Sequence, residues 1–290
     1  MGDRRVEVLP GDRAVLVENG PMRLVIQAYN GLSAELDLAR EAADYSCQCL
    51  ARVAAALPIL RKNHRLIDVD PVDELARAMV DSVRIIGDVD LTPMAAVAGT
   101  IADFVADWLV TRGATKVIVD NGGDIAIRLG ADSSASVGLR PVVNCPTVSH
   151  VVHLRPAWPS WGVTTSGLGG RSLTRGIASA VTVFAATATV ADAAATAIAN
   201  ACFAEDREIL QLPALAVDPN TDLGDLPVTV RAADLSETTI VAALENGWRK
   251  AENVRQRQNI RGAILVVGNR MALTSKFTEC VGELHAYDAQ

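Results

Sequence analysis

The sequence has few cysteines and few aromatic residues. Five of its 290 residues are cysteine, and aromatic side chains make up 4%. The cysteines are odd in number and scattered, which predicts reduced thiols, and Cys47 and Cys49 would point apart on a helix, which argues against a shared zinc ion or a disulfide. The shortage of aromatic side chains argues against a platform on which nucleic-acid bases could stack.

A surplus of positive charge is also missing. The formal net charge of −7 opposes sequence-independent binding to nucleic acid or to anionic lipid. The N-terminus shows no signal-peptide pattern, and Asp103 and Asp107 interrupt the longest apolar stretch. We therefore expect a cytoplasmic protein with no membrane segment and no nucleic-acid partner.

Half of the residues are hydrophobic, which predicts a large core. The mixture of helical and strand-like patterns lacks strict βαβ alternation, which favours an α+β fold with mainly antiparallel sheets. We expect a single domain over residues 1–290. Helices are predicted at 33–57, 71–86, 93–111, 190–202 and 237–257, strands mainly at 116–185, and hairpins at 14–27 and 261–275.

The segment Asn121-Gly122-Gly123-Asp124 joins two apolar strands. Two glycines let backbone amides approach a phosphate or a ring, and Asn121 and Asp124 can hydrogen-bond a ligand. The same pattern is a strong signal for an ordinary hairpin. On spacing alone the hairpin is favoured.

A second segment, residues 164–175, combines hydroxyls, glycines and arginines. These are the groups that hold phosphate oxygens. The segment has no Gly-Lys-Ser/Thr as in a Walker loop, and Ser172 stands where a dinucleotide fingerprint needs its third glycine. A phosphate-binding loop and a mobile surface loop explain the pattern about equally well.

Asp192 and Thr196 lie four residues apart on a predicted helix, so both project from one face. Their oxygens are hard ligands suited to Mg²⁺. Taken alone, the pair is better explained by a helix cap and a backbone-bonded threonine. The histidines offer no alternative centre, since His150 and His153 fall on opposite faces of a predicted strand.

Four segments in order resemble the ApbE-like superfamily, whose founding members are FAD:protein FMN transferases. They are Pro93–Gly99, Asp120–Ile125, Thr165–Gly167 and Ala191–Ala197. The likeness covers roughly residues 75–205 and is closest to a small uncharacterised branch of the superfamily. It implies an α+β fold with two related halves and a ligand in the cleft between them.

The resemblance also implies FAD or FMN as ligand and Mg²⁺ as cofactor. It assigns the metal to Asp192, Thr196 and the backbone carbonyl of Ala98. In the transferases the FMN phosphate passes to a threonine hydroxyl of a target protein and AMP leaves. The ligand-binding residues that the resemblance implies are Asn121, Gly122, Gly123, Asp124, Thr165, Ser166, Gly167, Gly169, Gly170 and Ser172.

The sequence departs from the transferases after the glycine-rich loop. It lacks their His-x-x-Asp-Pro-x-Thr-Gly segment, and it has Gly170-Arg171-Ser172 where the related branch usually has Gly-His-Ser. An arginine stays protonated, so Arg171 cannot act as a general base, although it can stabilise charge on a phosphate or carboxylate.

Two hypotheses follow from this departure. The first is an enzyme that binds an anionic, phosphorylated ligand with a divalent metal and carries out phosphoryl or flavin transfer. The second is a ligand-binding or assembly module without turnover. Unrelated hydrolase or reductase chemistry on this scaffold is a third reading, because fold does not fix function. Small residues on the helices leave a homodimer open.

Overall fold

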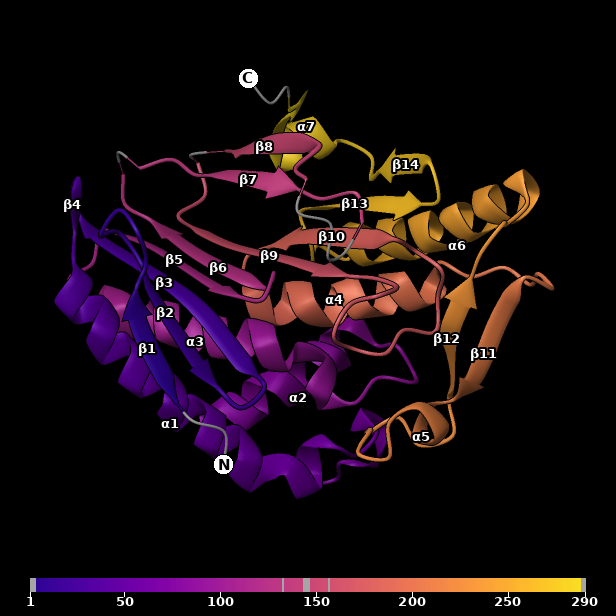
Figure 1. The fold of residues 1–290 in the computed structure, drawn as a ribbon, viewed down its shortest axis with the longest axis horizontal. Helices are drawn as coiled ribbons and strands as arrows, with labels where there is room; N and C mark the ends of the chain where they lie inside the picture. The colour runs from indigo at the N-terminus through magenta and orange to yellow at the C-terminus, as the bar shows by residue number, and fades with distance from the viewer. Residues whose placement is uncertain (1–3, 132, 143–146, 156, 288–290) are drawn as a thin grey trace. The chain divides into compact units, whose positions relative to one another are not determined.

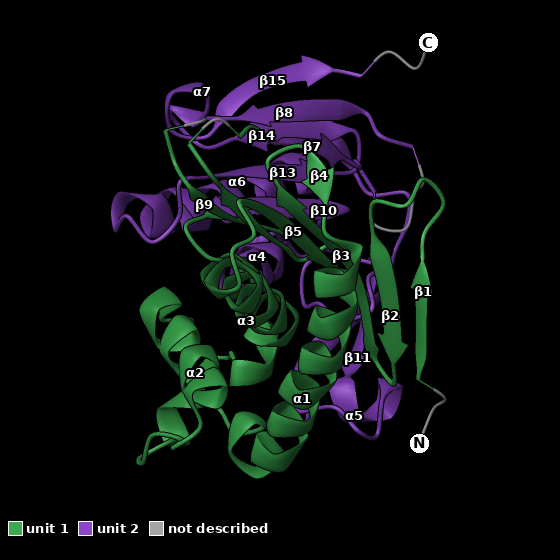
Figure 2. Ribbon diagram, turned by 90° about the vertical axis from the view of Figure 1, so that its left-hand side faces the viewer, with its two compact units in different colours: residues 1–134, 156–164, 185–192 green, residues 135–155, 165–184, 193–290 purple. Residues whose placement is uncertain are grey.

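The computed structural model describes residues 4–131, 133–142, 147–155 and 157–287. Chain contacts divide it into two compact units (Figure 2). Unit 1 comprises residues 1–134, 156–164 and 185–192, and unit 2 comprises residues 135–155, 165–184 and 193–290. Neither unit is a continuous stretch of chain, so each depends on segments that are far apart in the sequence.

Unit 1 is built on an antiparallel sheet in the order β1-β2-β3-β5-β6-β9, with the short β4 beside β3. Along β5 every second residue is buried, as expected for a sheet with one face against a core. The strands are β1 (Arg5–Val8), β2 (Val15–Asn19), β3 (Met22–Asn30), β4 (Ser33–Ala34), β5 (Lys116–Asn121), β6 (Ile125–Leu129) and β9 (Ser160–Ser166), of which the last two residues belong to unit 2.

Helices α1 and α3 pack on one face of this sheet, and α2 packs against both helices (Figure 1). They bury a cluster of Ala, Val, Leu and Ile side chains between helix and sheet. The helices are α1 (Leu36–Leu60), α2 (Glu74–Ile86) and α3 (Val97–Thr111), with short 3₁₀ turns at His64–Leu66 and Pro93–Ala96.

Helix α2 shows how its sequence fixes its ends. The Asp73 side chain accepts hydrogen bonds from the amides of Leu75 and Ala76, and Gly87 ends the helix with a φ of 69°. The helix therefore begins three residues later than the proline at 71 suggested, because the side chain of Asp73 supplies the cap.

Helix α1 differs from its prediction at both ends. Ser33 lies in β4, paired with Asn30, and the helix passes through Pro58 to Leu60. Continuation costs one backbone hydrogen bond. Burial of Leu60, which is fully shielded from solvent, favours the longer helix.

Helix α3 lies in the core of unit 1. The stretch Pro93–Val110 is long and apolar enough to cross a membrane, and 56% of it is buried inside the structure. The prediction that Asp103 and Asp107 interrupt this apolar stretch before it reaches membrane-spanning length is therefore wrong. Core helices meet the same criterion, and Asp103 on this helix is itself buried.

Unit 2 contains the antiparallel strands β10-β13-β14, which belong to the ten-stranded sheet, and two smaller antiparallel sheets in the orders β15-β8-β7 and β11-β12. Helix α6 covers one face of β13 and β14. The strands are β7 (Ser136–Leu139), β8 (His150–Leu154), β10 (Ala180–Ala185), β11 (Ile209–Pro213), β12 (Pro227–Ala232), β13 (Gly262–Val267), β14 (Arg270–Leu273) and β15 (Gly282–Ala286).

The helices of this part are α4 (Ala188–Ala201), α5 (Ala214–Val217), α6 (Glu237–Gln256) and α7 (Phe277–Cys280). The first five residues of α4 belong to unit 1 and the rest to unit 2. Antiparallel sheets together with separate helices make the predicted α+β class.

Candidate functional site

The strand register of unit 1 shows on which face of the sheet the Asn121 side chain lies. Val119, Ala126 and Gly162 are paired across β5, β6 and β9, and an added Cβ on Gly162 would lie 2.1 Å from the backbone nitrogen of Ala188 in α4. Side chains two residues along a strand share a face. Asn121 therefore also points toward the helices.

The predicted turn at residues 122–123 is a tight hairpin. Its glycines have φ values of 69° and 108°, which favour glycine. The Asp120 carboxylate accepts the amide of Gly123 at 2.7 Å, and the amide of Asn121 donates to the carbonyl of Asp124 at 3.0 Å. The hairpin reading is correct, and it directs the side chain of Asn121 inward, where only 3% of the residue is exposed.

The peptide between Ala98 and Gly99, in the first turn of α3, is held from both sides. Asn121 Nδ2 donates to the Ala98 carbonyl at 3.1 Å, and the Gly99 amide donates to Asp192 Oδ2 at 2.9 Å. In a trans peptide these groups point in opposite directions. Three of the predicted residues, Ala98, Asn121 and Asp192, thus lie around a single peptide group.

Two buried oxygens at this place have no hydrogen-bond partner among the described residues. They are Asn121 Oδ1 and Thr164 Oγ1. Continuing the register between β6 and β9 by one residue places Thr164 opposite Asp124, on the same face as Asn121. An unpartnered buried polar atom usually indicates a missing ligand, ion or water.

The carboxyl group of Asp192 is buried, although the residue as a whole is partly exposed to solvent. Burial raises the pKa of this carboxyl to about 7, and the negative charge of Asp103 acts in the same direction, while the amides of Gly99 and Ala98 oppose both. Within the described part of the chain, no basic side chain pairs with Asp192. Asp192 is therefore a buried carboxyl group without a basic partner among the described residues.

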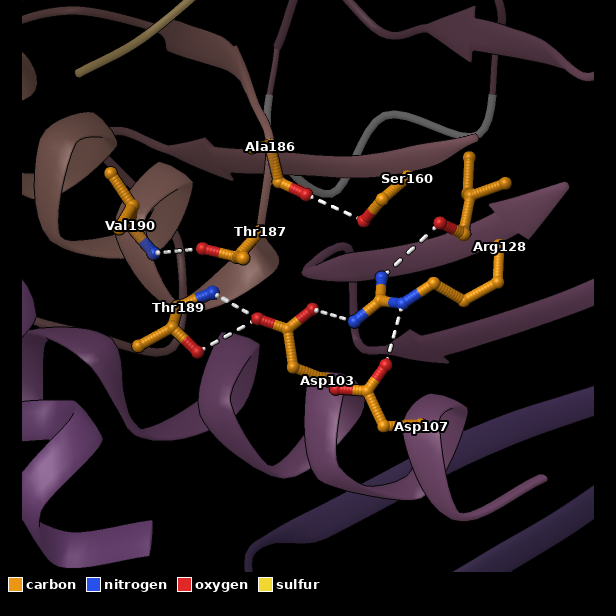
Figure 3. A network of polar contacts seen from close by, with 9 residues as sticks. Asp103, Asp107, Arg128, Ser160, Ala186, Thr187, Thr189 and Val190 are labelled. Carbon is orange, nitrogen blue, oxygen red and sulfur yellow. Dashed lines mark hydrogen bonds and ion pairs between the residues drawn. The ribbon is translucent and has the colours of Figure 1, made fainter. Parts of the chain in front are cut away.

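The helices α3 and α4 cap each other. Asp103 of α3 accepts the amide and the hydroxyl of Thr189, both at 2.7 Å, at the start of α4 (Figure 3). In return, Asp192 of α4 accepts the amide of Gly99 at the start of α3. Each carboxylate satisfies backbone donors that the other helix leaves unpaired and meets the positive end of its dipole.

Arg128 completes this network from β6 (Figure 3). Its guanidinium donates to Asp103 at 2.9 Å and to Asp107 at 2.7 Å. Burial opposes the charge of Arg128, but the two carboxylates raise its pKa above the ordinary value. The negative charge of Asp103 therefore has a partner, unlike that of Asp192.

Asp103, Arg128 and Thr189 were not predicted as site residues, and Thr164 was named only as the first hydroxyl of the segment 164–175. Asp103 carried a detectable signal, because a carboxylate in an otherwise apolar core helix needs a buried partner. Its contact with Thr189 joins residues 86 apart in sequence, so no local pattern could have identified that partner.

The glycine-rich loop belongs to unit 2, apart from Thr164. The Thr165 hydroxyl bonds that of Thr182 at 2.9 Å. An added Cβ on Gly167 would lie 2.8 Å from the Ser179 carbonyl, so this glycine permits a close backbone approach. Arg171 and Ser172 are exposed.

Thr196 lies on α4, one turn after Asp192. No group of three or more His, Cys, Asp or Glu residues in the described ranges is arranged to hold a metal. A metal centre here would therefore depend on hydroxyl and carbonyl oxygens beside a single carboxylate, which is the predicted set.

The chain matches the protein family described as AbpE bacteria over residues 6–273. The chain belongs to this family. A UPF0280 protein of Methanosphaerula palustris is 37% identical over 167 residues, which cover 57% of this chain and 68% of the relative. Another, from Methanothermobacter thermautotrophicus, is 30% identical over 192 residues, which cover 66% of this chain and 60% of the relative.

Among solved structures, the apo form of the flavinyl transferase ApbE of Pseudomonas stutzeri has a TM-score of 0.53 at 14% identity. The match covers 97% of this chain and 98% of that chain. At this identity the likeness shows the fold alone. The predicted ApbE-like superfamily and α+β fold are confirmed, and the predicted site residues remain predictions.

Proposed function

We propose that this family member binds a phosphorylated anionic ligand, a flavin nucleotide, together with a divalent cation, and that it supports metal-assisted phosphoryl or flavin transfer. The observation that carries the proposal is a group of buried side-chain oxygens in unit 1. They are the carboxylate of Asp192, which has no basic partner among the described residues, and Asn121 Oδ1 and Thr164 Oγ1, which have no hydrogen-bond partner there. Such a set repels a bare phosphate and requires a cation beside it.

In this proposal Asp192 and Thr196 hold the cation, with the carbonyl of Ala98 as a further ligand. The Ala98 carbonyl accepts the side-chain amide of Asn121 and points away from the Gly99 amide that Asp192 accepts, so its participation in this proposal requires a rotation of the Ala98–Gly99 peptide. A divalent ion supplies Lewis-acid stabilisation of charge on phosphate oxygens. Hard oxygen donors fit Mg²⁺.

The ligand in turn is proposed to contact the turn at 121–124 of unit 1. The loop from Thr165 to Ser172 of unit 2 is proposed separately as a phosphate-binding segment. Arg171 is exposed at the end of this loop, and its permanent charge suits stabilisation of a developing phosphate charge. The Pseudomonas stutzeri protein of similar fold is a flavinyl transferase, which makes a flavin nucleotide the first ligand to test.

A second candidate function is ligand binding without turnover. The observation that favours it is Arg171 itself, because a guanidinium cannot take a proton from an acceptor hydroxyl. A module of this kind would bind the same ligand and release it unchanged.

The test is incubation of the purified full chain with FAD and Mg²⁺. Calorimetry measures binding, and chromatography with mass spectrometry measures AMP, FMN and covalent flavin. The proposal expects Mg²⁺-dependent FAD binding that weakens at least tenfold in Asp192→Asn and in Thr196→Val. Asp37→Asn, a substitution of a side chain that is 94% exposed, is the matched control and leaves binding unchanged.

Each outcome separates the two candidates. Release of AMP supports transfer, whereas tight binding without product supports the module. Absence of Mg²⁺-dependent binding, or equal binding by wild type and both site variants, contradicts the proposed site. Asp192 also caps α3, so Asp192→Asn can unfold the protein. In that case FAD binding by Thr196→Val, which keeps the shape of the side chain, decides whether the proposed site is correct.

A further inference from the structure

Unit 2 contains a cavity of about 310 Å³ that none of the predicted site residues line. Its floor is one face of the β10–β13 pair. Ala180 pairs with Val266, and Thr182 pairs with Ile264, so these four side chains share that face.

The opposite face of the pair is covered by helix. An added Cβ on Gly247 of α6 would lie 2.9 Å from the side chain of Leu265, and Leu265 alternates with Ile264 and Val266 along β13. The cavity therefore lies on the face that α6 leaves uncovered.

The charged side chains of the lining are two arginines, and its other polar side chains are His150, Ser149, Thr182 and Asn269. Arg140 follows β7, His150 begins β8, and Arg270 begins β14. The described lining residues include no aspartate or glutamate. Arg270 forms an ion pair with Glu237 of α6, which is not a lining residue. Apolar walls together with arginine side chains suit an organic anion with an apolar body.

The cavity volume limits the size of the ligand that can bind. Small-molecule pockets range over about 300–1,000 Å³, and this cavity lies at the lower end. A dinucleotide is too large for it. A monocarboxylate with a compact aromatic or aliphatic body matches both the volume and the charge.

We propose that this cavity is a binding site for a small apolar monocarboxylate, with Arg140 and His150 facing the carboxylate and the β10–β13 face holding the apolar body. The site does not depend on the proposed flavin function. Thr182 on the floor bonds Thr165 of the glycine-rich loop, but none of the residues that line the cavity is a predicted site residue, so the two sites can be tested separately.

The experiment is isothermal titration calorimetry of the full chain with 2-naphthoate, and with 2-naphthamide as the neutral probe of the same shape. The expected result is saturable binding of 2-naphthoate, at least tenfold tighter than that of the amide. Arg140→Gln removes the charge and Met271→Glu adds a repelling carboxylate, and each weakens naphthoate binding at least tenfold.

Two matched controls leave naphthoate binding unchanged. Arg207→Gln removes an arginine that is 92% exposed, and Leu215→Glu adds a carboxylate at an apolar side chain that is 44% exposed, close to the 42% of Met271. Arg140 and Met271 are both exposed, so their variants are expected to fold.

Three results would overturn the proposal. They are the absence of saturable naphthoate binding, equal binding of the amide and the carboxylate, and equal binding by Arg140→Gln, Met271→Glu and wild type. Displacement of 2-naphthoate by FAD with Mg²⁺ would overturn the assignment of a separate site. Failure of FAD to bind, with naphthoate binding intact, contradicts only the proposed function.

Discussion

Individual charged residues in unit 1 contribute very different amounts to the free energy of unfolding. Asp103 and Asp107 both contact Arg128, but their side chains are 6% and 63% exposed. Removing one partner of a buried pair leaves an uncompensated charge, whereas an exposed pair contributes little.

We predict that Asp103→Asn destabilises the protein by about 3 kcal/mol. The substitution removes the charge that neutralises Arg128 and weakens the cap on Thr189. Urea denaturation at pH 7 measures the effect. Asp107→Asn is the control and costs less than about 1 kcal/mol; comparable losses in both variants would contradict the buried network.

A second prediction concerns Asp73, which caps α2 and pairs with Arg52. The hydrogen bond from Arg52 is the main cause that lowers the pKa of Asp73, with help from the amide of Ala76. Asp73→Ala should cost about 1 kcal/mol at pH 7, mostly from the lost cap because the ion pair is partly exposed.

The pH dependence of this loss has a defined sign. A carboxyl with a lowered pKa in the folded state stabilises the protein above its unfolded pKa, and that contribution disappears as the pH falls through the folded value. Denaturation curves of Asp73→Ala and wild type should therefore converge below pH 3.8, the ordinary value for aspartate. Asp37→Ala should match wild type throughout, and a gap that widened in acid would refute this account.

At the level of elements, close packing of α3 against α4 depends on Gly99. An added Cβ there would lie 2.2 Å from the carbonyl oxygen of Ala188 and 2.9 Å from Asp192 Cβ. Backbone atoms cannot move aside as a flexible side chain does, so the two helices would have to separate.

We predict that Gly99→Ala costs about 3 kcal/mol or more and weakens any Mg²⁺ binding, because it displaces Asp192. Thermal unfolding with and without Mg²⁺ measures both effects. Gly31→Ala is the control, since its Cβ meets open space and only its φ of +60° is unfavourable, at a cost of about 1–2 kcal/mol. Equal stability of the two variants would show that the helices tolerate separation.

Elements with strong local signals were predictable. The 3.6-residue apolar period of α3 and the glycine after α2 set those helices, and the two glycines at 122–123 set the β5–β6 hairpin. The β11–β12 pair was missed because its strands are separated by α5 and a polar turn, and β11 lacks clear alternation of burial.

The site was predictable only in part. The short motifs identified Asn121 and Asp192, because glycine turns and hard oxygen ligands have local patterns. They could not show that Asp192 reaches Gly99, 93 residues away, or that Thr164 lies on the side of Asn121. Such contacts follow from strand register and helix packing, which a single sequence does not encode locally.

At the level of the whole molecule, unit 1 is assembled from three separate stretches of chain. Residues 1–134 contain α1 to α3 and five strands of the main sheet order, but not β9, which pairs with β6. They also lack the start of α4, which caps and covers α3.

We predict that a fragment of residues 1–134 does not unfold cooperatively. Its β6 edge would be unpaired and the small-residue surface of α3 uncovered, so the fragment loses both hydrogen bonds and buried area. Circular dichroism during heating should show a gradual change, in contrast to a sharp transition for the full chain. A sharp transition for the fragment would mean that the first stretch is stable by itself.

The discontinuity of unit 1 has a consequence during synthesis. Translation proceeds at about 5–20 residues per second, so several seconds separate the emergence of β6 from that of the residues up to 192 that close the unit. In this interval the nascent chain presents an open strand edge while still attached to the ribosome. The yield of folded protein would then depend on how well this edge is protected. A chaperone can cover it, and slow translation initiation can keep nascent chains on the same mRNA apart.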